Sequence, residues 1–440
     1  MQCDYQRPQC GRCLRSGIVC EGYTRDLIFV VYDGPAPQLE PQIEEQQLMR
    51  SPVSIPMCPN NNRLDAFHSF LTQYLPEKPL LYELSLRWLQ SLSVSQGRYR
   101  QLDRATDALG TVVLARSLND NKALAVGMEL YGKALAELRQ GQLTENNWRG
   151  ALMTAVVLQI YEAVESSAAA GDGWLRHSVG ICSILENVGP AAVQEGAIHE
   201  TFLCSRVSVT IGSIISEKPT LLAAPEWQSV PWAKMPKTHL HRLLDSVSQL
   251  PALLHASTVL SRRIGTSAQS NDQTVCFYRL RRDIDIAMDL WWNDLTTSRD
   301  GPLLWSRPSK DPSQQPFTEM LCYQKLTDAQ MITFYCEARL HCHKAASRVI
   351  GNSYLPPNDG ETKASETPFE SLLHYADSIC QSSIFMLGQE FGILGLHFTI
   401  MPLLAANHFY TEAGLWEKRD WCTRTLDRMA SRPFSILSRN

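Results

Sequence analysis

The stretch NDNKALAVGMELYGKALAELRQG, at residues 119–141, decides the structural class of this 440-residue chain. Its larger apolar side chains recur every three or four positions, which places them on one face of an α-helix. They are Leu124, Met128, Tyr131, Leu135 and Leu138. Asn119 or Asp120 can cap the start of this helix, and Gly141 can end it. We therefore predict an amphipathic helix over these residues.

Similar three- and four-residue spacings recur along the rest of the chain. They predict helices over residues 145–165, 174–188, 195–215, 272–292, 317–350, 370–387 and 391–410. Both faces of the 145–165 helix are apolar, which predicts burial nearly all round. Alternating strand patterns with hairpin turns are scarce, and no fixed-period repeat is visible. We therefore predict an all-α fold for residues 63–440.

Residues 391–410, FGILGLHFTIMPLLAANHFY, contain no Asp, Glu, Lys or Arg and are about as long as a bilayer span. They also carry His397, Pro402, Asn407 and His408, which are polar or helix-breaking groups that hydrocarbon tolerates poorly. We expect a buried helix of the core rather than a membrane span, and no membrane partner.

Composition narrows the functional class. Hydrophobic residues form 44% of the chain and charged residues 20%, which suffices for a packed core. The net charge of −4 excludes a uniformly basic nucleic-acid binder, so any contact with nucleic acid requires a local patch. The first residues, MQCDYQRPQC, hold no apolar run typical of a secretory signal. In a reducing compartment we expect the 13 cysteines to be metal ligands or buried thiols rather than disulfides.

Four cysteines lie within the first 20 residues in the pattern C-x6-C-x2-C-x6-C: Cys3, Cys10, Cys13 and Cys20. Thiolates suit structural zinc, and a two-residue gap lets one turn aim two sulfurs at one ion. Residues 1–27 hold almost no apolar core, so metal would have to stabilise any fold there. The alternative is a frayed tail with four free thiols. Residues 28–62 follow as a flexible linker rich in proline and glutamine, without a sustained heptad.

The segment C-D-x3-P-x-C-x2-C-x6-C at residues 3–20 resembles the second part of the fungal Zn2Cys6 binuclear cluster. That family consists of transcription factors, so the resemblance implies zinc as a cofactor and promoter DNA as a partner. It also implies that Cys10 bridges two zinc ions, while Cys3, Cys13 and Cys20 are terminal ligands.

Two parts of the family's pattern have no counterpart here: the first two cysteines, and the basic segment that forms the DNA-contacting helix. Four thiolates alone cannot ligate two zinc ions properly, although they can in principle hold one. Four arginines face three acidic residues in residues 1–27. Arg7, Arg12 and Arg15 are candidate phosphate contacts, the alternative being a solvated surface. Either Met1 is an internal methionine of a longer reading frame, or the protein has lost its DNA-reading helix.

Residues 63–440 resemble the fungal-specific transcription factor domain that follows such clusters, closely over 63–232 and loosely over the rest. The resemblance rests on short segments in the expected order: LYGKAL at 130–135, LQIYE at 158–162, GW at 173–174 with His177, GI at 180–181, NVGP at 187–190, PEW at 225–227 and PW at 231–232. In that family the domain is all-helical and regulatory, without catalytic residues. We expect His177 to be a hydrogen-bonded structural histidine, and Tyr131 and Tyr161 to be core residues.

No nucleophile elbow, P-loop, dinucleotide fingerprint or HExxH motif is present, and we expect no enzymatic activity. The densest group of metal-capable side chains in the body is His341-Cys342-His343, with Cys336 nearby. Adjacent helical residues point about 100° apart, so these three side chains cannot face one ion. A partly buried helix face is the expected role.

These observations predict a nuclear, sequence-specific transcription regulator, and the family resemblance points to a fungal gene cluster of secondary metabolism as its target. The expected partners are promoter DNA, if the cluster is completed upstream, together with the transcription machinery or co-regulators and a second copy in a homodimer. The alternative is a regulator-derived binding protein that no longer reads DNA and acts on a partner through its helical domain.

Overall fold

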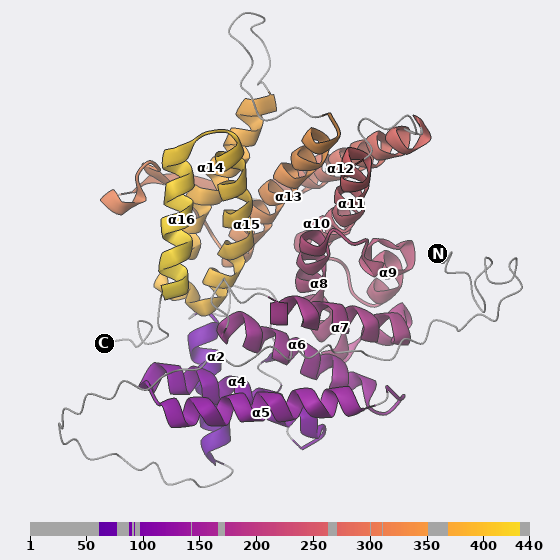
Figure 1. Ribbon diagram of the computed structural model, residues 1–440, viewed down its shortest axis with the longest axis vertical. Helices are drawn as coiled ribbons and strands as arrows, with labels where there is room; N and C mark the ends of the chain where they lie inside the picture. The colour runs from indigo at the N-terminus through magenta and orange to yellow at the C-terminus, as the bar shows by residue number, and fades with distance from the viewer. Residues whose placement is uncertain are drawn as a thin grey trace, which may run out of the picture.

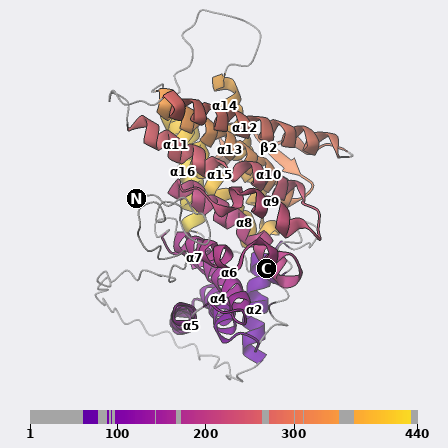
Figure 2. The same cartoon turned by 90° about the vertical axis from the view of Figure 1, so that its right-hand side faces the viewer.

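The computed structural model describes residues 61–76, 88–89, 92, 97–141, 143–165, 172–262, 271–299, 301–309, 311–350 and 368–431. These residues form an all-α body, which confirms the predicted fold class (Figure 1, and turned by 90° in Figure 2). Its longer helices are α2 (Asn61–Tyr74), α4 (Arg100–Leu118), α5 (Asn121–Gln140), α6 (Trp148–Glu165), α7 (Asp172–Val188), α8 (Gly196–Ser216), α10 (His239–Val247), α11 (Leu250–Ser261), α12 (Asn271–Thr297), α13 (Leu326–Ile350), α14 (Pro368–Met386), α15 (Gly392–Glu412) and α16 (Trp416–Ser431). The predicted module at 1–27 and nearly all of the predicted linker at 28–62 lie outside the described residues.

The helix predicted at 119–141 is α5, and Asp120 rather than Asn119 is its N-cap. The Asp120 carboxylate accepts hydrogen bonds from the backbone N–H groups of Lys122 and Ala123. Asn119 ends α4 instead, with a left-handed φ of 53° that reverses the chain. As a result, α4 and α5 pack side by side at the base of the body in Figure 1.

α6 confirms the predicted helix that is buried nearly all round. It is apolar on every face, and almost all of its residues are buried. Four helices surround it, namely α4, α5, α7 and α8. Such enclosure is needed because a helix without a polar face cannot border on solvent at low cost.

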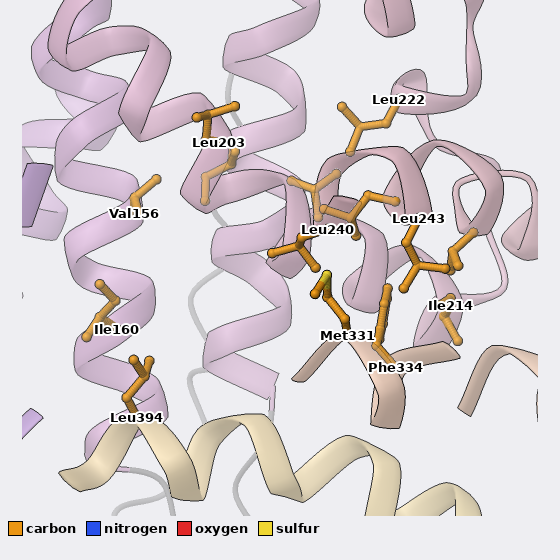
Figure 3. Packing of buried hydrophobic residues seen from close by; sticks show 14 of the residues in the cluster. Val156, Ile160, Leu203, Ile214, Leu222, Leu240, Leu243, Met331, Phe334 and Leu394 are labelled. Carbon is orange, nitrogen blue, oxygen red and sulfur yellow. The ribbon is translucent and has the colours of Figure 1, made fainter. Parts of the chain in front are cut away.

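One continuous apolar core joins the early helices to the late ones (Figure 3). It combines side chains of α6, α8, α10, α13 and α15, among them Val156, Leu203, Leu240, Met331 and Leu394. Each buried leucine or methionine side chain contributes about 1.5–3 kcal/mol relative to an exposed one. Because these helices lie far apart in the sequence, the core stabilises the arrangement of the whole described body.

The helix predicted at 317–350 is wrong in its first part. Residues 319–323 form β2 (Glu319–Tyr323), which pairs antiparallel with β1 (Leu304–Pro308), and α13 begins only at Leu326. The connection contains the 3-10 helix η7 (Pro312–Gln314) instead of a two-residue hairpin turn, so no standard turn signal marks it. Tyr323 attaches β2 to α14, since its hydroxyl lies 2.6 Å from Ser382 Oγ.

Within the described residues, Gln389–Glu412 is the one helical segment that is long and apolar enough to cross a membrane. It contains α15, which packs against α2, α13, α14 and α16. Inside this packing, His397 Nδ1 lies 3.3 Å from the Tyr74 hydroxyl, and His397 Nε2 lies 3.1 Å from the Ala163 backbone oxygen. α15 thereby connects α2 and α6 to the last helices of the body, as expected for a helix of the core.

Candidate functional sites in the N-terminal module and the helical body

The residues predicted to bind zinc and DNA all lie outside the described part of the chain: Cys3, Cys10, Cys13, Cys20, Arg7, Arg12 and Arg15. Their donor chemistry can be compared with what zinc requires. Four thiolates fit the tetrahedral shell of one structural zinc ion, whereas a cluster of six cysteines needs two more. Among the described residues, no group of three or more His, Cys, Asp or Glu side chains is placed to hold a metal ion.

Three segments that carry the family resemblance meet between α5, α6 and α7. They contribute Tyr131, Tyr161, Glu162 and His177, termed the tyrosine cluster below. The Tyr131 hydroxyl donates to Glu162 Oε1, and its ring stacks on Tyr161 with centroids 4.4 Å apart. His177 Nε2 lies 3.1 Å from Tyr131 Oη. Because the single Tyr131 proton is directed at Glu162, His177 Nε2 carries the proton of this second hydrogen bond.

Burial sets the protonation state of His177. The residue is only 3% exposed. Desolvation, with a smaller contribution from Arg139, lowers the pKa of His177 to about 4. His177 is therefore neutral near pH 7 and hydrogen-bonded, which agrees with the structural role expected of it.

Gly173, at the start of α7, leaves room for the Glu162 carboxylate. A Cβ atom at this position would lie 2.3 Å from Glu162 Oε2. A larger residue would displace the carboxylate that accepts the Tyr131 proton. The glycine of the GW segment therefore belongs to the same structural unit as the tyrosine cluster.

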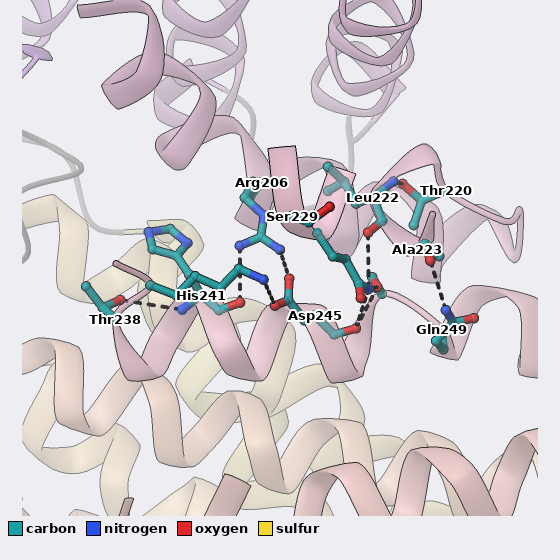
Figure 4. Close-up of polar contacts among 12 residues, drawn as sticks. Arg206, Thr220, Leu222, Ala223, Ser229, Thr238, His241, Asp245 and Gln249 are labelled. Carbon is teal, nitrogen blue, oxygen red and sulfur yellow. Dashed lines mark hydrogen bonds and ion pairs between the residues drawn. The ribbon is translucent and has the colours of Figure 1, made fainter. Parts of the chain in front are cut away.

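A second group surrounds Arg206 of α8, a side chain that is 1% exposed (Figure 4). Its guanidinium donates to Asp245 Oδ1 at 2.5 Å and to the backbone oxygen of His241 at 3.1 Å. The guanidinium also lies 5.1 Å from the ring centroid of Trp232. Lys237 binds the other carboxylate oxygen of Asp245. Arg206, Trp232, Lys237, His241 and Asp245 are termed the arginine cluster below.

Several nitrogens of the arginine cluster have no hydrogen-bond partner among the described residues. They are Arg206 Nε, Trp232 Nε1, and both ring nitrogens of His241. Burial, followed by the nearby cation Arg206, lowers the pKa of His241 well below its usual value. His241 is therefore a neutral ring that fills space beside two cations.

The arginine cluster lies at one end of a polar network that attaches residues 217–238 to α10. This segment contains η5 (Leu221–Ala223), α9 (Pro225–Ser229) and η6 (Val230–Trp232). Gln228 Nε2 donates to the backbone oxygen of Asp245 at 3.2 Å. Gln249 Nε2 donates to the backbone oxygen of Ala223 at 3.0 Å (Figure 4). The tryptophans of the PEW and PW segments pack on α8, since the buried Trp227 contacts Phe202 and Trp232 contacts Arg206. These two segments therefore have a structural role.

The group at 341–343 spreads around α13, as its helical spacing predicts. Cys342 is buried, while His341 Nε2 lies 3.6 Å from Glu337 Oε1 one turn earlier. Burial raises the pKa values of Cys336 and Cys342 to about 12, so both remain protonated thiols near pH 7. All eight described cysteines are free, including Cys380 and Cys422, whose Sγ atoms lie 3.5 Å apart.

Sequence reasoning missed the arginine cluster. A usable signal was nevertheless present, because Arg206 is the only charged residue between Glu200 and Glu217. A lone charge within an otherwise neutral stretch of a helix must find a counter-charge when it is buried. The sequence does not reveal that this partner is Asp245, 39 positions later.

Comparison with known proteins finds similarity in two parts: a family for residues 1–27 and a relative over a longer stretch. Residues 1–27 match the family described as the fungal Zn(2)-Cys(6) binuclear cluster domain. A stretch of 165 residues is 27% identical to the uncharacterized protein AN5342 of Emericella nidulans, and it covers 34% of this chain and 35% of that protein. The chain thus matches about a third of the length of this curated relative. No solved structure matches the chain.

The family match confirms the resemblance inferred from the cysteine spacing. The matched domain belongs to DNA-binding transcription regulators, which are not enzymes. Through residues 1–27, this chain is therefore related to the fungal Zn(2)-Cys(6) regulators, with four of the six cluster cysteines present and zinc as the cofactor that the domain implies.

Proposed function

We propose that the protein is a sequence-specific regulator of transcription that acts in the nucleus on a fungal metabolic gene cluster. The observation that carries the proposal is the match of residues 1–27 to the Zn(2)-Cys(6) binuclear cluster domain. The all-α body supports it, because the buried His177 and Cys342 are neutral side chains packed in the core. Among the described residues, no group of metal-capable side chains is placed to hold an ion.

The proposed organisation has three parts. Residues 1–27 form the zinc module, with Cys3, Cys10, Cys13 and Cys20 as metal ligands. Zinc, when bound, would supply the stability that a segment without an apolar core lacks. Residues 28–62 are the linker, and residues 63–440 are the regulatory domain, similar to the fungal-specific transcription factor domain. This domain would transmit its state to co-regulators or to the transcription machinery.

In the proposed DNA complex, Arg7, Arg12 and Arg15 contact phosphate oxygens. Such contacts provide affinity without sequence information, and each one adds to the salt dependence of binding. Replacing Arg12 with alanine should weaken binding to all sequences about equally and lower the salt slope by about one.

A second candidate function is supported by the composition of the same segment. Residues 1–27 carry four arginines against three acidic residues, a small excess of positive charge that is weak for phosphate binding. In this second candidate function, the protein is a regulator-derived binding protein that acts on a partner through the helical body rather than by reading DNA.

One pair of measurements tests both candidates. Zinc per chain is determined by elemental mass spectrometry, and promoter binding by a gel-shift assay, on the full chain with and without any in-frame residues encoded ahead of Met1. The regulator hypothesis predicts two zinc ions and a salt-sensitive shift for the extended chain. The chelator-treated protein should lose both.

The matched variants are Cys13→Ser in the module and Cys276→Ser in the body, where Cys276 is an exposed free thiol. Cys13→Ser should lose zinc and DNA binding, whereas Cys276→Ser should retain both. Zinc binding without any shift at low salt would favour the second candidate. If neither the chain as given nor its extended version binds zinc, both the metal site and the regulator proposal are contradicted.

A further inference from the structure

Two buried thiols, one on α14 and one on α16, are in contact. The Sγ atoms of Cys380 and Cys422 lie 3.5 Å apart, and both residues are 0% exposed. The two residues are 42 positions apart, so the fold rather than the local sequence brings them together. The sulfurs of a disulfide lie about 2.05 Å apart, so a shift of roughly 1.5 Å would place this pair at bonding distance.

A chain of hydrogen bonds leads from these sulfurs towards the surface. Cys380 Sγ lies 3.7 Å from the Tyr410 hydroxyl. This hydroxyl donates to Asp377 Oδ1 at 2.8 Å, so its oxygen is available to accept from the Cys380 thiol. Lys418 donates to both oxygens of Asp377, at 2.7 and 2.8 Å, and the Asp377 side chain is 28% exposed. The Cys380 proton therefore has a path to a carboxylate that borders on solvent.

α16 is the less firmly packed of the two helices. Of its described residues, only Trp421, Cys422 and Thr425 are buried. It packs mainly against α15, beside which it lies in Figure 1, whereas α14 packs against α13, α15 and β2. A helix with so few buried side chains should open locally at a lower cost than the whole body unfolds. Such an opening exposes Cys422 and leaves Cys380 in place on α14.

While α16 is closed, the pair is protected from reaction. Burial, followed by the contact with Cys422, raises the pKa of Cys380 well above its usual value. Because the thiolate is the nucleophile, a buried thiol of this kind is inert. Opening of α16 brings Cys422 into contact with solvent, where an oxidant can reach it. The site can therefore respond to an oxidant only through Cys422, and only when α16 opens.

We propose that Cys380 and Cys422 form a redox modification site, which hydrogen peroxide converts into a reversible disulfide between α14 and α16. The disulfide holds α16 on the body, whereas the reduced pair leaves α16 able to open. Peroxide suits the site because its other product is water, which can leave from between two buried sulfurs. The proposal goes beyond transcription regulation and depends on neither zinc nor DNA, since it concerns described residues of the body.

In the proposed reaction, two thiols and one peroxide give one disulfide and two waters, and two electrons pass from sulfur to oxygen. While α16 is open, the Cys422 thiolate attacks one peroxide oxygen and the O–O bond breaks. The product is a sulfenic acid, and the hydroxide that leaves takes up a proton to become the first water. When α16 closes, Cys380 attacks this sulfur and passes its proton through Tyr410 to Asp377. The S–O bond breaks, and the departing hydroxide takes that proton to become the second water.

Peptide mapping of the full chain tests the proposal. The reduced chain is treated with hydrogen peroxide in native buffer, its remaining thiols are blocked with N-ethylmaleimide in urea, and the digested peptides are identified by mass spectrometry. A peptide pair joined through Cys380 and Cys422 should form, and dithiothreitol should reverse it. Cys336 and Cys342, both buried on α13, are the internal controls and should stay reduced. The proposal is overturned if Cys380 and Cys422 stay reduced as well, or if they pair only in the unfolded chain.

Three single variants test the order of the two steps. With Cys380→Ser, oxidation should stop at a sulfenic acid on Cys422, which dimedone traps. With Cys422→Ser, no sulfenic acid should form on Cys380, because its sulfur stays buried. The matched control is Cys276→Ser, which removes an exposed thiol from α12 and should leave the disulfide intact. A sulfenic acid on Cys380 but not on Cys422 would contradict the role of α16 opening.

Hydrogen exchange measures the proposed effect on α16. The amide protons of α16 should exchange several-fold more slowly in the oxidised chain than in the reduced one, while those of α5 should be unchanged. Peroxide-treated Cys380→Ser should show no such protection, and circular dichroism checks that each variant retains the fold. Equal exchange in α16 before and after disulfide formation would show that the disulfide does not hold the helix closed.

Discussion

The tyrosine cluster and the arginine cluster satisfy their buried polar groups in different ways. The tyrosine cluster links neutral groups and one carboxylate by hydrogen bonds, with Tyr131 between Glu162 and His177. The arginine cluster holds a buried guanidinium between Asp245 and the Trp232 ring, and it leaves both nitrogens of His241 without a partner among the described residues. A buried cation tolerates little change, whereas an unpaired neutral ring can be replaced at low cost.

The largest expected effect comes from removing the counter-charge of Arg206. Asp245→Ala leaves a buried guanidinium without its carboxylate, and we expect a loss of about 3–5 kcal/mol in the free energy of unfolding. Urea denaturation at neutral pH measures this loss. Asp294→Ala is the control, because Asp294 is half-exposed and pairs with Arg242 at the surface. If both substitutions have the same small effect, the arginine cluster does not stabilise the fold as described.

A smaller effect should appear on acidification, through His177. Its pKa of about 4 in the folded chain lies below the usual value of 6.5. The unfolded chain therefore takes up a proton at higher pH than the folded chain does. The stabilisation that comes from the neutral His177 ring is fully present above about pH 6.5. It is lost as the pH falls towards 4, at up to about 1.4 kcal/mol per pH unit.

The variant His177→Gln isolates this contribution, because glutamine keeps a donor for Tyr131 but does not titrate. The free energy of unfolding, measured by urea denaturation between pH 4 and 6.5, should depend less on pH in the variant. The difference in slope should correspond to the uptake of up to one proton on unfolding. Parallel curves for the wild type and the variant would show that His177 is not a buried neutral base.

The smallest expected effect comes from replacing His241, and its size relative to that of His177 distinguishes the roles of the two residues. His241→Leu removes a ring without hydrogen-bond partners, so we expect the free energy of unfolding to change by less than about 1 kcal/mol. His177→Leu removes a donor to Tyr131 and should cost about 1–2 kcal/mol. Thermal unfolding of the two variants side by side gives the order. The opposite order would mean that His241, not His177, has the hydrogen-bonded structural role.

The elements that could be predicted correctly are those with strong local sequence signals. α5 was recognisable because Asp120, the apolar spacing and Gly141 all agree on one helix. β2 was mistaken for part of a helix because Met320, Leu321 and Tyr323 are also compatible with helical packing, and no short hairpin turn separates β2 from β1. Boundaries of this kind are decided by long-range pairing, such as Leu304 with Tyr323, which local patterns do not contain.

The candidate functional sites likewise differ in whether local sequence patterns reveal them. The cysteine spacing of residues 3–20 is a local pattern, and it identified the family. The arginine cluster depends on contacts between α8 and α10, which the pattern of neither helix contains by itself.

The hydrogen bond between Tyr74 and His397 has a consequence for how the protein is made. The two residues are 323 positions apart. At a synthesis rate of 5–20 residues per second, His397 leaves the peptidyl-transferase centre roughly 16–65 s after Tyr74. Until then α2 can pack only on its early neighbours, and its side facing α15 stays accessible to chaperones and proteases. A stop codon between α2 and α15 would leave that surface uncovered and make the fragment a substrate for degradation.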